Sequence, residues 1–487
     1  MLFLFDIWIK SRLLVRIRQI QNLFFKHMGF KFIRNSHKFY LIGIIIFCVF
    51  QNQSVSAARE PLIRVLISKN KNLRIRSDRS IPLIIKGQKF SNKKIKGLTL
   101  KKEGNRTTIF FDKNRQKIYN LKNKEKFVIK SSDRRGIWVG QKRYEGKLKI
   151  FIIDNKILVV NVLSIEKYLS SVVGSEMPPK WPLEALKAQA IASRTYALKQ
   201  KGNLFYDIDS TNMNQVYLGL EARNYKTKRA VSSTRSLVLT YKNKLINALF
   251  HSSSGGMTEN SEDVWQNKYP YLSSVKDFDK NNPKLRWYKK FSNYELQKLF
   301  PKIGGIQQIE ILNVTNTGRV KDVKLFGIYS SDQMSGVDIR KKMNLASTFI
   351  RFKFIEENEN KFNSNPKLLG INSLDNEPLI HIVKVRDSLT FIADQYDVSV
   401  DQIIALNNIN DSSLIKIGQR LLVPRNSLNT SSSLEKILVV SGYGSGHGVG
   451  MSQWGAKYMA TKGEEAVNIL KHFYKGIRIQ PFNKNLL

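Results

Sequence analysis

One acidic side chain stands where the sequence predicts a rigid backbone. Glu176 lies in the segment SVVGSEMPPKWPLEALKAQAIASRTYAL, residues 171–198, and three prolines follow it closely. Proline fixes its own φ angle and disfavours helix in the residue before it, so we expect a non-helical turn here. Pro182 fits the first position of the helix that follows. A carboxyl group held on such a turn could act as a general acid and base.

The predicted helix after Pro182 would bury one side against the protein core. Its apolar stripe comprises Leu183, Leu186, Ala190 and Ala197. Glu184 suits the positive N-terminal end of this helix. The ordinary alternative for an isolated Glu in a turn is a solvated side chain with no chemical role, and residue types alone leave both interpretations of Glu176 open.

Two glycine-rich segments could bring their backbone close to a ligand. They are FHSSSGGMT, residues 250–258, and GSGHGVGMSQWGA, residues 444–456. The second lacks the G-K-[ST] ending and the G-x-G-x-x-G spacing of nucleotide-binding loops, so we do not predict a nucleotide site. A glycan cleft edged by backbone amides, His447 and Gln453 fits better. His447 and His251 would then either orient the substrate or bond to loop carbonyls.

The chain is strongly basic, with a formal net charge of +43 over 487 residues. Such a surface attracts polyanions, for which nucleic acid, an anionic cell wall and a membrane surface are the candidates. No zinc-finger, homeodomain or RNP pattern is present and the basic residues are spread along the chain, so we do not predict a nucleic-acid partner. The hydrophobic fraction of 42% provides ample material for packed domains.

Residues 1–57 have the pattern of an N-terminal extension followed by a secretory signal peptide. Basic residues precede an apolar run at 39–50, which is too short for an ordinary membrane-spanning helix, and Ala57 ends an A-x-A-like cleavage site. We expect export to the periplasm or cell wall, with an uncleaved signal anchor as the alternative. The only cysteine, Cys48, lies in the apolar run, so the mature chain offers no disulfide and no cysteine ligand for zinc.

The remaining sequence predicts an α+β fold of mixed strands and helices. Short β-rich runs alternate with turns from residue 61 to about 149, and a hairpin then leads into the Glu176 segment. Residues 230–250 have the pattern of a helix end followed by another hairpin. Polar stretches at 356–377 and 426–434 are predicted linkers. Between them, the order β-α-α-β is predicted within residues 381–424.

The unit at 381–424 resembles a LysM module, a binder of glycans that contain N-acetylglucosamine. Asp387 and Ser388 are expected to cap its first helix and Ser399 its second. Arg386 stands where the family usually has Gly. The resemblance implies a ligand groove between the loops at 387–390 and 410–415. The binding residues that it implies are Asp387, Ser388, Leu389, Leu414 and Ile415.

The rest of the chain resembles the SpoIID/LytB family of stage II sporulation protein D and amidase enhancers. The string SEMP carries the family's proposed catalytic Glu, here Glu176. Further matches follow in the family's order: QVYLG at 215–219, the segment 231–241 with Ser236 in place of the usual Gly, the S-x-S-G-G turn of 250–258, and the segment 444–456. We therefore expect a SpoIID-type domain at 60–360 and 430–485, with the LysM module, 378–425, inserted in it.

This resemblance implies a lytic transglycosylase that cleaves the MurNAc–GlcNAc bonds of peptidoglycan strands with Glu176 as its single catalytic residue. Burial would have to raise the pKa of Glu176, with Met177 and Trp181 as candidates for its apolar wall. The substrate-binding residues expected in the larger domain are Gln215, Tyr217, Ser253, Gly255, Gly256, His447 and Gln453. Some family members bind zinc near the S-x-S-G-G turn through His and Cys, but this chain lacks those cysteines, so we expect no metal and no cofactor. The alternative function is a non-catalytic, glycan-binding enhancer of an N-acetylmuramoyl-L-alanine amidase.

Overall fold

The computed structural model describes residues 60–357, 379–423 and 435–486, apart from gaps at 79–80, 105, 113, 123, 154–155, 201, 266, 385–386, 397, 408 and 410–414. The predicted extension and signal peptide lie outside these residues, as do most of both predicted linkers. The described chain combines helices with several sheets, which confirms the α+β class. No helix in the described ranges is long and apolar enough to cross a membrane.

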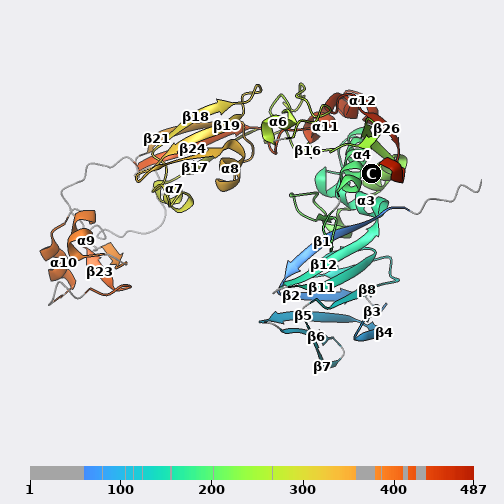
Figure 1. The fold of residues 1–487 in the computed structure, drawn as a ribbon, viewed down its shortest axis with the longest axis horizontal. Helices are drawn as coiled ribbons and strands as arrows, with labels where there is room; N and C mark the ends of the chain where they lie inside the picture. The colour runs from blue at the N-terminus through green and yellow to red at the C-terminus, as the bar shows by residue number, and fades with distance from the viewer. Residues whose placement is uncertain are drawn as a thin grey trace, which may run out of the picture. The chain divides into compact units, whose positions relative to one another are not determined.

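The N-terminal part of the described chain forms two β-sheets that share one core (Figure 1). Their strand orders are β13-β1-β12-β11-β8-β3-β4 and β10-β9-β2-β5-β6-β7. The bounds are β1 (Leu62–Asn70), β2 (Asn72–Ser77), β3 (Leu83–Gly87), β4 (Phe90–Ile95), β5 (Gly97–Glu103), β6 (Arg106–Phe111), β7 (Asn114–Leu121), β8 (Lys126–Lys130), β9 (Ile137–Val139), β10 (Lys142–Tyr144), β11 (Lys147–Ile153), β12 (Lys156–Ser164) and β13 (Ile208–Asp209). The predicted hairpin before the Glu176 segment is the antiparallel pair β11–β12. β12 is buried along nearly its whole length and leads directly into the first helix.

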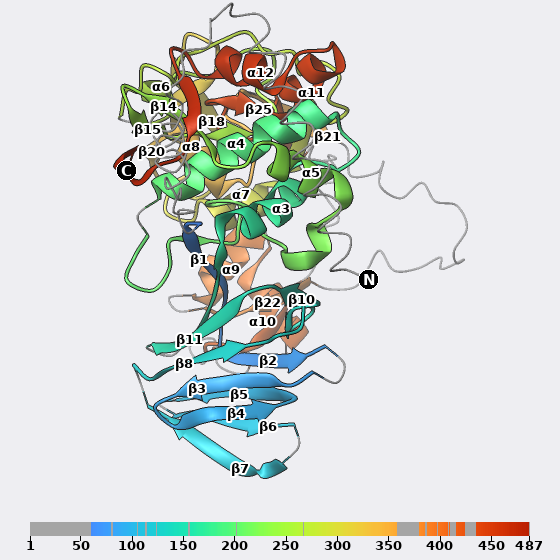
Figure 2. The same ribbon diagram turned by 90° about the vertical axis from the view of Figure 1, so that its right-hand side faces the viewer.

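Helices and a small sheet follow these β-sheets in the described chain (Figure 2). The helices are α3 (Ile165–Glu176), α4 (Leu183–Lys199), α5 (Tyr225–Ser233), α11 (Gln453–Thr461) and α12 (Ala466–Phe473). The sheet joins β14 (Leu237–Tyr241), β15 (Lys244–Leu245) and β26 (Arg478–Pro481), and the short elements are η1 (Gly219–Ala222), α6 (Ser261–Val264), β16 (Phe250–His251), β25 (Met451–Ser452) and η3 (Lys484–Leu486). The other four helices all pack on α4. α4 is therefore buried around most of its circumference, and the single apolar stripe predicted for it was too narrow.

A buried ion pair ties α3 to α4. The Arg194 guanidinium, 1% exposed, donates two hydrogen bonds to the Glu166 carboxylate at 2.8 and 2.7 Å, and a third to the Leu237 carbonyl at 3.1 Å. These contacts join α3, α4 and β14 at one point. Removing one partner of such a pair leaves the other charge buried without compensation.

We expect Arg194→Leu to lower the free energy of unfolding by about 3–5 kcal/mol, measured by urea denaturation. The matched control is Lys187→Leu, which removes a partly exposed partner of Glu184 on the same helix. That change should lower the free energy of unfolding by less than about 1 kcal/mol. A similar small cost for both variants would show that the Arg194 pair does not hold the helices together.

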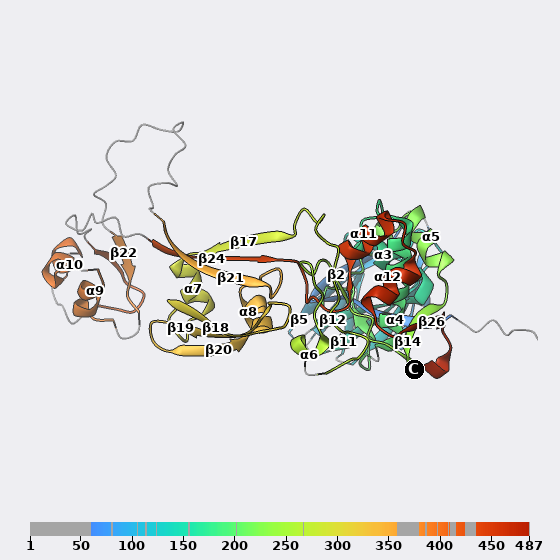
Figure 3. The same cartoon turned by 90° about the horizontal axis from the view of Figure 1, so that it is seen from above.

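A second α+β unit contains two three-stranded sheets, and its strands flank the predicted LysM module in the sequence (Figure 3). One sheet has the order β17-β24-β21 and the other β18-β19-β20. The bounds are β17 (Arg286–Phe291), α7 (Asn293–Leu299), β18 (Gln308–Val314), β19 (Val320–Phe326), β20 (Ser331–Ser335), α8 (Gly336–Lys342), β21 (Ile350–Glu357) and β24 (Glu435–Tyr443). β21 precedes the predicted LysM module and β24 follows it, and the two strands pair from Ile350↔Gly442 to Glu357↔Glu435. The prediction therefore began the first linker, 356–377, two residues too early, because Glu356 and Glu357 continue the strand ladder.

The predicted LysM unit has its own small core and the expected β-α-α-β order. Its elements are β22 (Leu379–Ile382), α9 (Leu389–Tyr396), α10 (Val400–Asn407) and β23 (Arg420–Val423), with β22 antiparallel to β23. Apolar side chains of both helices and both strands are buried together. Ser388 accepts a hydrogen bond from the Phe391 amide and Ser399 one from the Gln402 amide, so both serines cap helices as predicted.

Candidate active site

Glu176 is the last residue of α3 and not part of a non-helical turn, so that expectation was wrong. Pro178 restricts only the residue directly before it, Met177, which is extended with φ −127° and ψ 138°, and the helix therefore runs on through Glu176. Pro182 is likewise outside its helix: with ψ 144° it is the N-cap of α4, whose first residue is Leu183. Glu176 thus lies at the C-terminal end of a helix, where the helix dipole disfavours negative charge.

The Glu176 carboxyl group is held by one hydrogen bond on each oxygen. The Val216 amide donates to Oε1 at 2.7 Å, and the Gln453 side-chain amide donates to Oε2 at 3.3 Å. Burial raises the pKa of Glu176 above its ordinary value, although both hydrogen bonds act in the opposite direction. The carboxyl group is therefore fixed in place and retains its proton to higher pH than a solvated Glu.

Glu176 opens into a cavity of about 700 Å³. Two of the predicted residues, His447 and Gln453, line it together with Glu176. Met177 and Trp181, expected as an apolar wall, are buried in the core and do not line the cavity. Among the described residues that line it, Glu176 is the only carboxylic acid.

Several lining residues carry no motif and were missed from the sequence. Tyr196 of α4 and Trp265 contribute aromatic rings, while Arg340 and Lys341 of α8 contribute positive charge. Arg340 also donates a hydrogen bond from Nε to the Leu345 carbonyl at 3.3 Å. Arg340 and Lys341 belong to the second α+β unit and Glu176 to the helical part, so no local sequence pattern marks the two cations as cavity residues.

The two glycine-rich segments meet beside the cavity and bring two histidines together. β16 and β25 pair in parallel, and the His251 and His447 ring centroids lie 5.4 Å apart. The Val449 amide donates to His447 Nδ1 at 3.1 Å, so Nε2 carries the proton and donates to the Phe250 carbonyl, also at 3.1 Å. Burial lowers the pKa of His447 to about 4 and that of His251 well below its ordinary value. Both rings are therefore neutral at pH 7.

His251 lines the cavity and has one buried ring nitrogen without a partner among the described residues. Its Nδ1 lies 3.1 Å from the Val449 carbonyl, to which it donates. Within the described part of the chain, the buried Nε2 has no hydrogen-bond partner. The neutral ring thus keeps one unsatisfied acceptor atom, which is buried beneath the cavity surface.

Comparison with known proteins places these features in two domain families. Residues 153–241 match the family model described as Stage II sporulation protein, and residues 381–424 match the LysM domain. The chain carries a SpoIID domain and a LysM module. The SpoIID match contains Glu176, the whole of α4 and the Val216 amide that binds the carboxyl group.

Relatives of the SpoIID domain extend the similarity over most of the chain. A stage II sporulation protein D of Bacillus subtilis is 29% identical over 343 residues, which cover 66% of this chain and 75% of that protein. An uncharacterised protein of Brachyspira hyodysenteriae is 29% identical over 367 residues, 74% of this chain and 78% of that protein. The amidase enhancer of Bacillus subtilis is 29% identical over 315 residues, 64% of this chain but only 40% of the enhancer.

Gln215 and Tyr217 of the SpoIID domain face the core, so the structure does not place these two predicted binding residues in the cavity. Gln215 accepts a hydrogen bond from the Tyr168 hydroxyl at 3.0 Å and donates to the Ser193 carbonyl at 3.2 Å. The Tyr217 hydroxyl donates to Asn161 Oδ1 at 2.8 Å. Both side chains are almost fully buried, and these internal partners satisfy their hydrogen-bonding groups. They anchor the segment on either side of Val216, whose amide holds Glu176.

Ser252 of the S-x-S-G-G turn lines the cavity, whereas Ser253, Gly255 and Gly256 lie outside its lining. Asp279 Oδ2 accepts from the Ser253 hydroxyl at 2.6 Å and from the Gly255 amide at 2.7 Å. Gly255 and Gly256 have φ angles of +88° and +112°, which favour glycine. Ser253, Gly255 and Gly256 therefore shape the loop that presents His251, and their predicted contact with substrate is not seen in the cavity.

The predicted ligand residues of the LysM module that are described have internal partners. Asp387 accepts from the Lys384 amide at 2.7 Å and lies 2.9 Å from His381 Nε2, and these bonds lower its pKa. Ser388 caps α9, Leu389 is buried, and Ile415 packs against the module's core. Leu414, Arg386 and most of the second predicted groove loop lie outside the described residues.

The described residues contain no cluster of three or more His, Cys, Asp or Glu side chains arranged to hold a metal ion. His251 and His447 are neighbours, with ring centroids 5.4 Å apart, and both already bond to backbone groups.

Proposed function

We propose that the SpoIID domain is a lytic transglycosylase that cleaves the MurNAc–GlcNAc bonds of peptidoglycan strands. The observation that carries this proposal is the geometry of Glu176, a carboxyl group of raised pKa held by two hydrogen bonds inside a cavity of about 700 Å³. The positive charge of Arg340 and Lys341 suits a substrate that bears carboxylates. The LysM module would add a second site for the same glycan.

A single carboxyl group is sufficient for this reaction. Protonated Glu176 donates its proton to the glycosidic oxygen as the bond from that oxygen to the MurNAc anomeric carbon breaks. The acetamido oxygen of the same sugar attacks this carbon, as in substrate-assisted glycosidases. The Glu176 carboxylate then removes the proton of the 6-hydroxyl group, whose oxygen displaces the acetamido oxygen and closes a 1,6-anhydro ring. Glu176 regains its proton, and no water is consumed.

The pH dependence of the rate tests the role of Glu176. The reaction starts from the protonated acid, so the rate should fall as the pH rises through the pKa of Glu176. Because burial raises that pKa, the fall should occur above the ordinary Glu value of about 4.3. The measurement is the initial rate of cleavage of soluble glycan strands at constant ionic strength. A rate that instead climbs continuously from about pH 5 to pH 8 would exclude Glu176 as the general acid.

The second candidate function is a non-catalytic enhancer of a cell-wall amidase. The similarity to a protein named amidase enhancer favours it. In that case the cavity would bind glycan without cleaving it, and the partner would be an N-acetylmuramoyl-L-alanine amidase. Either function requires export to the periplasm or cell wall, which the pattern of residues 1–57 predicts.

A further inference from the structure

Arg340 is a partly buried cation without an acidic partner in the described part of the chain. It lies in the last turn of α8 and lines the cavity that also contains Glu176. Among the described residues, its guanidinium group makes one hydrogen bond, from Nε to the Leu345 carbonyl at 3.3 Å, and no ion pair with a carboxylate. Burial lowers the pKa of Arg340, and no acidic group in the described ranges opposes this effect. A charge that is partly withdrawn from water without a counter-charge is costly to the fold.

Two more deeply buried arginines of the same fold are paired with carboxylates. Arg194 Nη2 lies 2.7 Å from Glu166 Oε2, and Arg319 Nε lies 3.6 Å from Glu259 Oε2. Where an arginine is buried for structural reasons, the chain thus supplies the counter-charge itself. A guanidinium group that lines a cavity and lacks an internal counter-charge suits an anion that enters the cavity from outside.

Stabilisation of the end of α8 does not account for this arrangement. Cations in the last turn of a helix interact favourably with the helix dipole. Lys341 and Lys342 stand in the same turn, and both side chains are exposed. They can serve the dipole while remaining in water, so the dipole does not require a third cation that is withdrawn from solvent.

Hydrogen bonds fix Arg340 relative to the glycine-rich lining of the cavity. The Leu345 amide donates to the Arg340 carbonyl at 2.8 Å, so both the main chain and the side chain of Arg340 bond to Leu345. The next residue, Ala346, accepts a hydrogen bond from the Gly446 amide at 2.9 Å. Leu345 and Gly446 themselves line the cavity. These bonds present the guanidinium group in a defined place, as selective binding requires.

An aromatic ring in the same lining suits the uncharged part of a sugar. Trp265 is 38% exposed, and its ring centroid lies 5.2 Å from that of the neutral His447 ring. An indole ring can stack on the apolar side of a pyranose. Arg340 and Trp265 therefore offer different contacts to an acidic glycan, one for its carboxylate and one for its rings.

We propose that Arg340 makes the cavity specific for muramic acid, by forming a bidentate ion pair with a carboxylate that this sugar carries. The carboxylate is the lactyl group of a peptide-free strand or a carboxylate of an attached stem peptide. A chain of N-acetylglucosamine alone has no carboxylate and gains no affinity from Arg340. This inference rests on the proposed function for the identity of the glycan, and it names the feature of that glycan which the cavity recognises.

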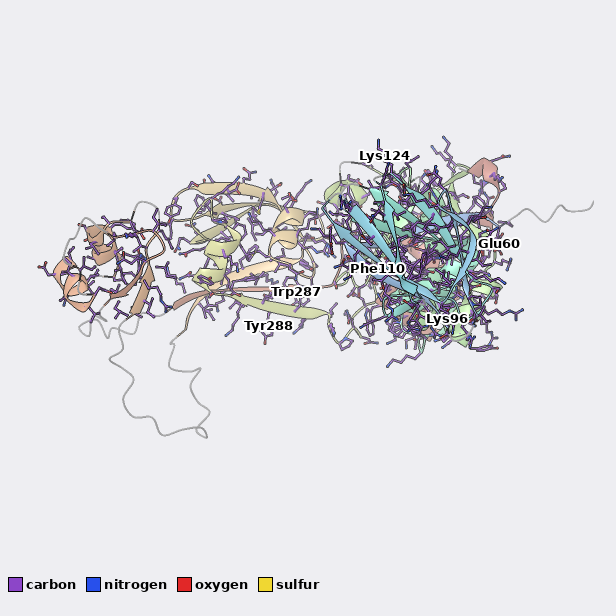
Figure 4. The ribbon with its side chains drawn as sticks, turned by 90° about the horizontal axis from the view of Figure 1, so that it is seen from below. Glu60, Lys96, Phe110, Lys124, Trp287 and Tyr288 are labelled. Carbon is purple, nitrogen blue, oxygen red and sulfur yellow. The ribbon has the colours of Figure 1, made fainter. Side chains whose placement is uncertain are left out.

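Tryptophan fluorescence of the full-length Glu176→Gln protein measures occupancy of the cavity. Under the proposed mechanism this variant cannot cleave its ligand. Trp265 lines the cavity, whereas residues 381–424 contain no tryptophan, so glycan bound to the LysM module does not contact a tryptophan of that module. Trp265→Phe in the same background should abolish the signal and thereby identifies its source. The described tryptophans outside the cavity lining are Trp138, Trp181, Trp454 and Trp287, the last of which is labelled on β17 in Figure 4.

Three soluble oligosaccharides of equal length distinguish the possible carboxylates. They are a peptide-free muramic acid strand, the same strand with its carboxylates converted to neutral methyl amides, and a strand with intact stem peptides. We expect Arg340→Met to weaken binding of an anionic strand at least about tenfold and to leave binding of the neutral strand unchanged. A loss on the peptide-free strand assigns the lactyl carboxylate, and a loss confined to the peptide-bearing strand assigns the stem peptide. Arg340→Lys, which keeps the charge without the bidentate geometry, should give an intermediate loss.

Lys342→Met is the matched control. It removes a cation from the same turn of α8, but Lys342 does not line the cavity and its Nζ lies 4.5 Å from the Phe300 ring centroid. This change should alter the affinity for each strand less than twofold. Because Arg340 lacks an acidic partner in the described chain, Arg340→Met should lower the unfolding temperature no more than Lys342→Met does. Equal losses in the two variants, an equal loss on the neutral strand, or unchanged affinity for both anionic strands would overturn the inference.

The two proposals can fail separately. If the wild-type protein forms no cleavage product but the fluorescence titration shows a preference for anionic strands that depends on Arg340, the proposed function is wrong and the role of Arg340 remains. If cleavage occurs while Arg340→Met binds every strand as tightly as its parent protein, the role of Arg340 is wrong and the proposed function remains.

Discussion

Replacing Glu176 with Gln should reduce the rate of glycan cleavage by roughly 10²–10⁴-fold while glycan binding is kept. Gln can still accept the hydrogen bond of the Val216 amide, but it cannot donate a proton to the glycosidic oxygen or remove one from a hydroxyl group. The assay is the rate of product formation from soluble strands at saturating concentration. Because the reaction uses this side chain twice, we expect no other single conservative change in the cavity to match this loss.

The same substitution should not destabilise the fold. The pKa of Glu176 is raised in the folded protein, so ionisation opposes folding as the pH rises above the ordinary Glu value. Neutral Gln removes this cost, and the unfolding temperature at pH 7 should stay equal to that of the wild type or increase. A lower unfolding temperature would mean that the loss of rate includes a loss of structure.

Glu184→Gln is the matched control for this experiment. Glu184 lies at the start of α4, pairs with Lys187 and accepts a hydrogen bond from the Ala466 amide at 3.0 Å, and it does not line the cavity. Its replacement should cost about 0.3–1 kcal/mol of stability and little activity. Equal, small effects of both substitutions on cleavage would refute the catalytic role. Full stimulation of an amidase by Glu176→Gln, with no cleavage by the wild type, would establish the enhancer function instead.

Excising residues 376–425 should weaken binding to insoluble peptidoglycan by about 10²-fold or more and leave cleavage of soluble strands largely intact. When one of two linked sites holds a glycan strand, the effective concentration of that strand at the other site rises. Removing the LysM module abolishes this gain. The structure favours a folded product, because Glu357 and Glu435 on the two sides of the module are paired across β21 and β24, and the module's core is separate. A sedimentation assay with purified cell walls measures the binding.

The control for the excision is the unfolding transition of the shortened protein. Retention of the transition together with normal binding would show that the module contributes no affinity. Loss of the transition would show that the module supports the fold of the surrounding domain, contrary to the separation of the cores.

Local patterns in the sequence predicted much of the fold because they act over a few residues. Alternating apolar residues correctly predicted β-strands and the hairpin before α3. Serine caps, together with the spacing of apolar residues, correctly predicted the two LysM helices. Ser236 stands where the SpoIID/LytB family usually has Gly, and its φ angle is +65°. The replacement of Gly by Ser therefore falls at a backbone conformation that favours glycine. The helical end at Glu176 was missed because proline restricts only the residue before it.

The composition of the cavity could not be predicted in the same way. Gln453 donates to Glu176 from 277 residues further along the chain, and Arg340 reaches the cavity from a unit that the LysM module interrupts. Gln215 and Tyr217 are polar residues in a motif, which suggested ligand contact, whereas the core satisfies them with Tyr168 and Asn161. Which polar side chains face a cavity depends on buried partners that only the folded chain brings together.

Mass spectrometry of the products formed in oxygen-18 water tests the central claim most directly. Peptide-free glycan strands are incubated with the mature protein, with Glu176→Gln as the control. We predict new chain ends that are 1,6-anhydro sugars without heavy oxygen, absent from the control, because the sugar's own 6-hydroxyl group and not water attacks the anomeric carbon. Reducing ends that carry the heavy oxygen, or strands that remain uncut by the wild type, would contradict a transglycosylase built on Glu176.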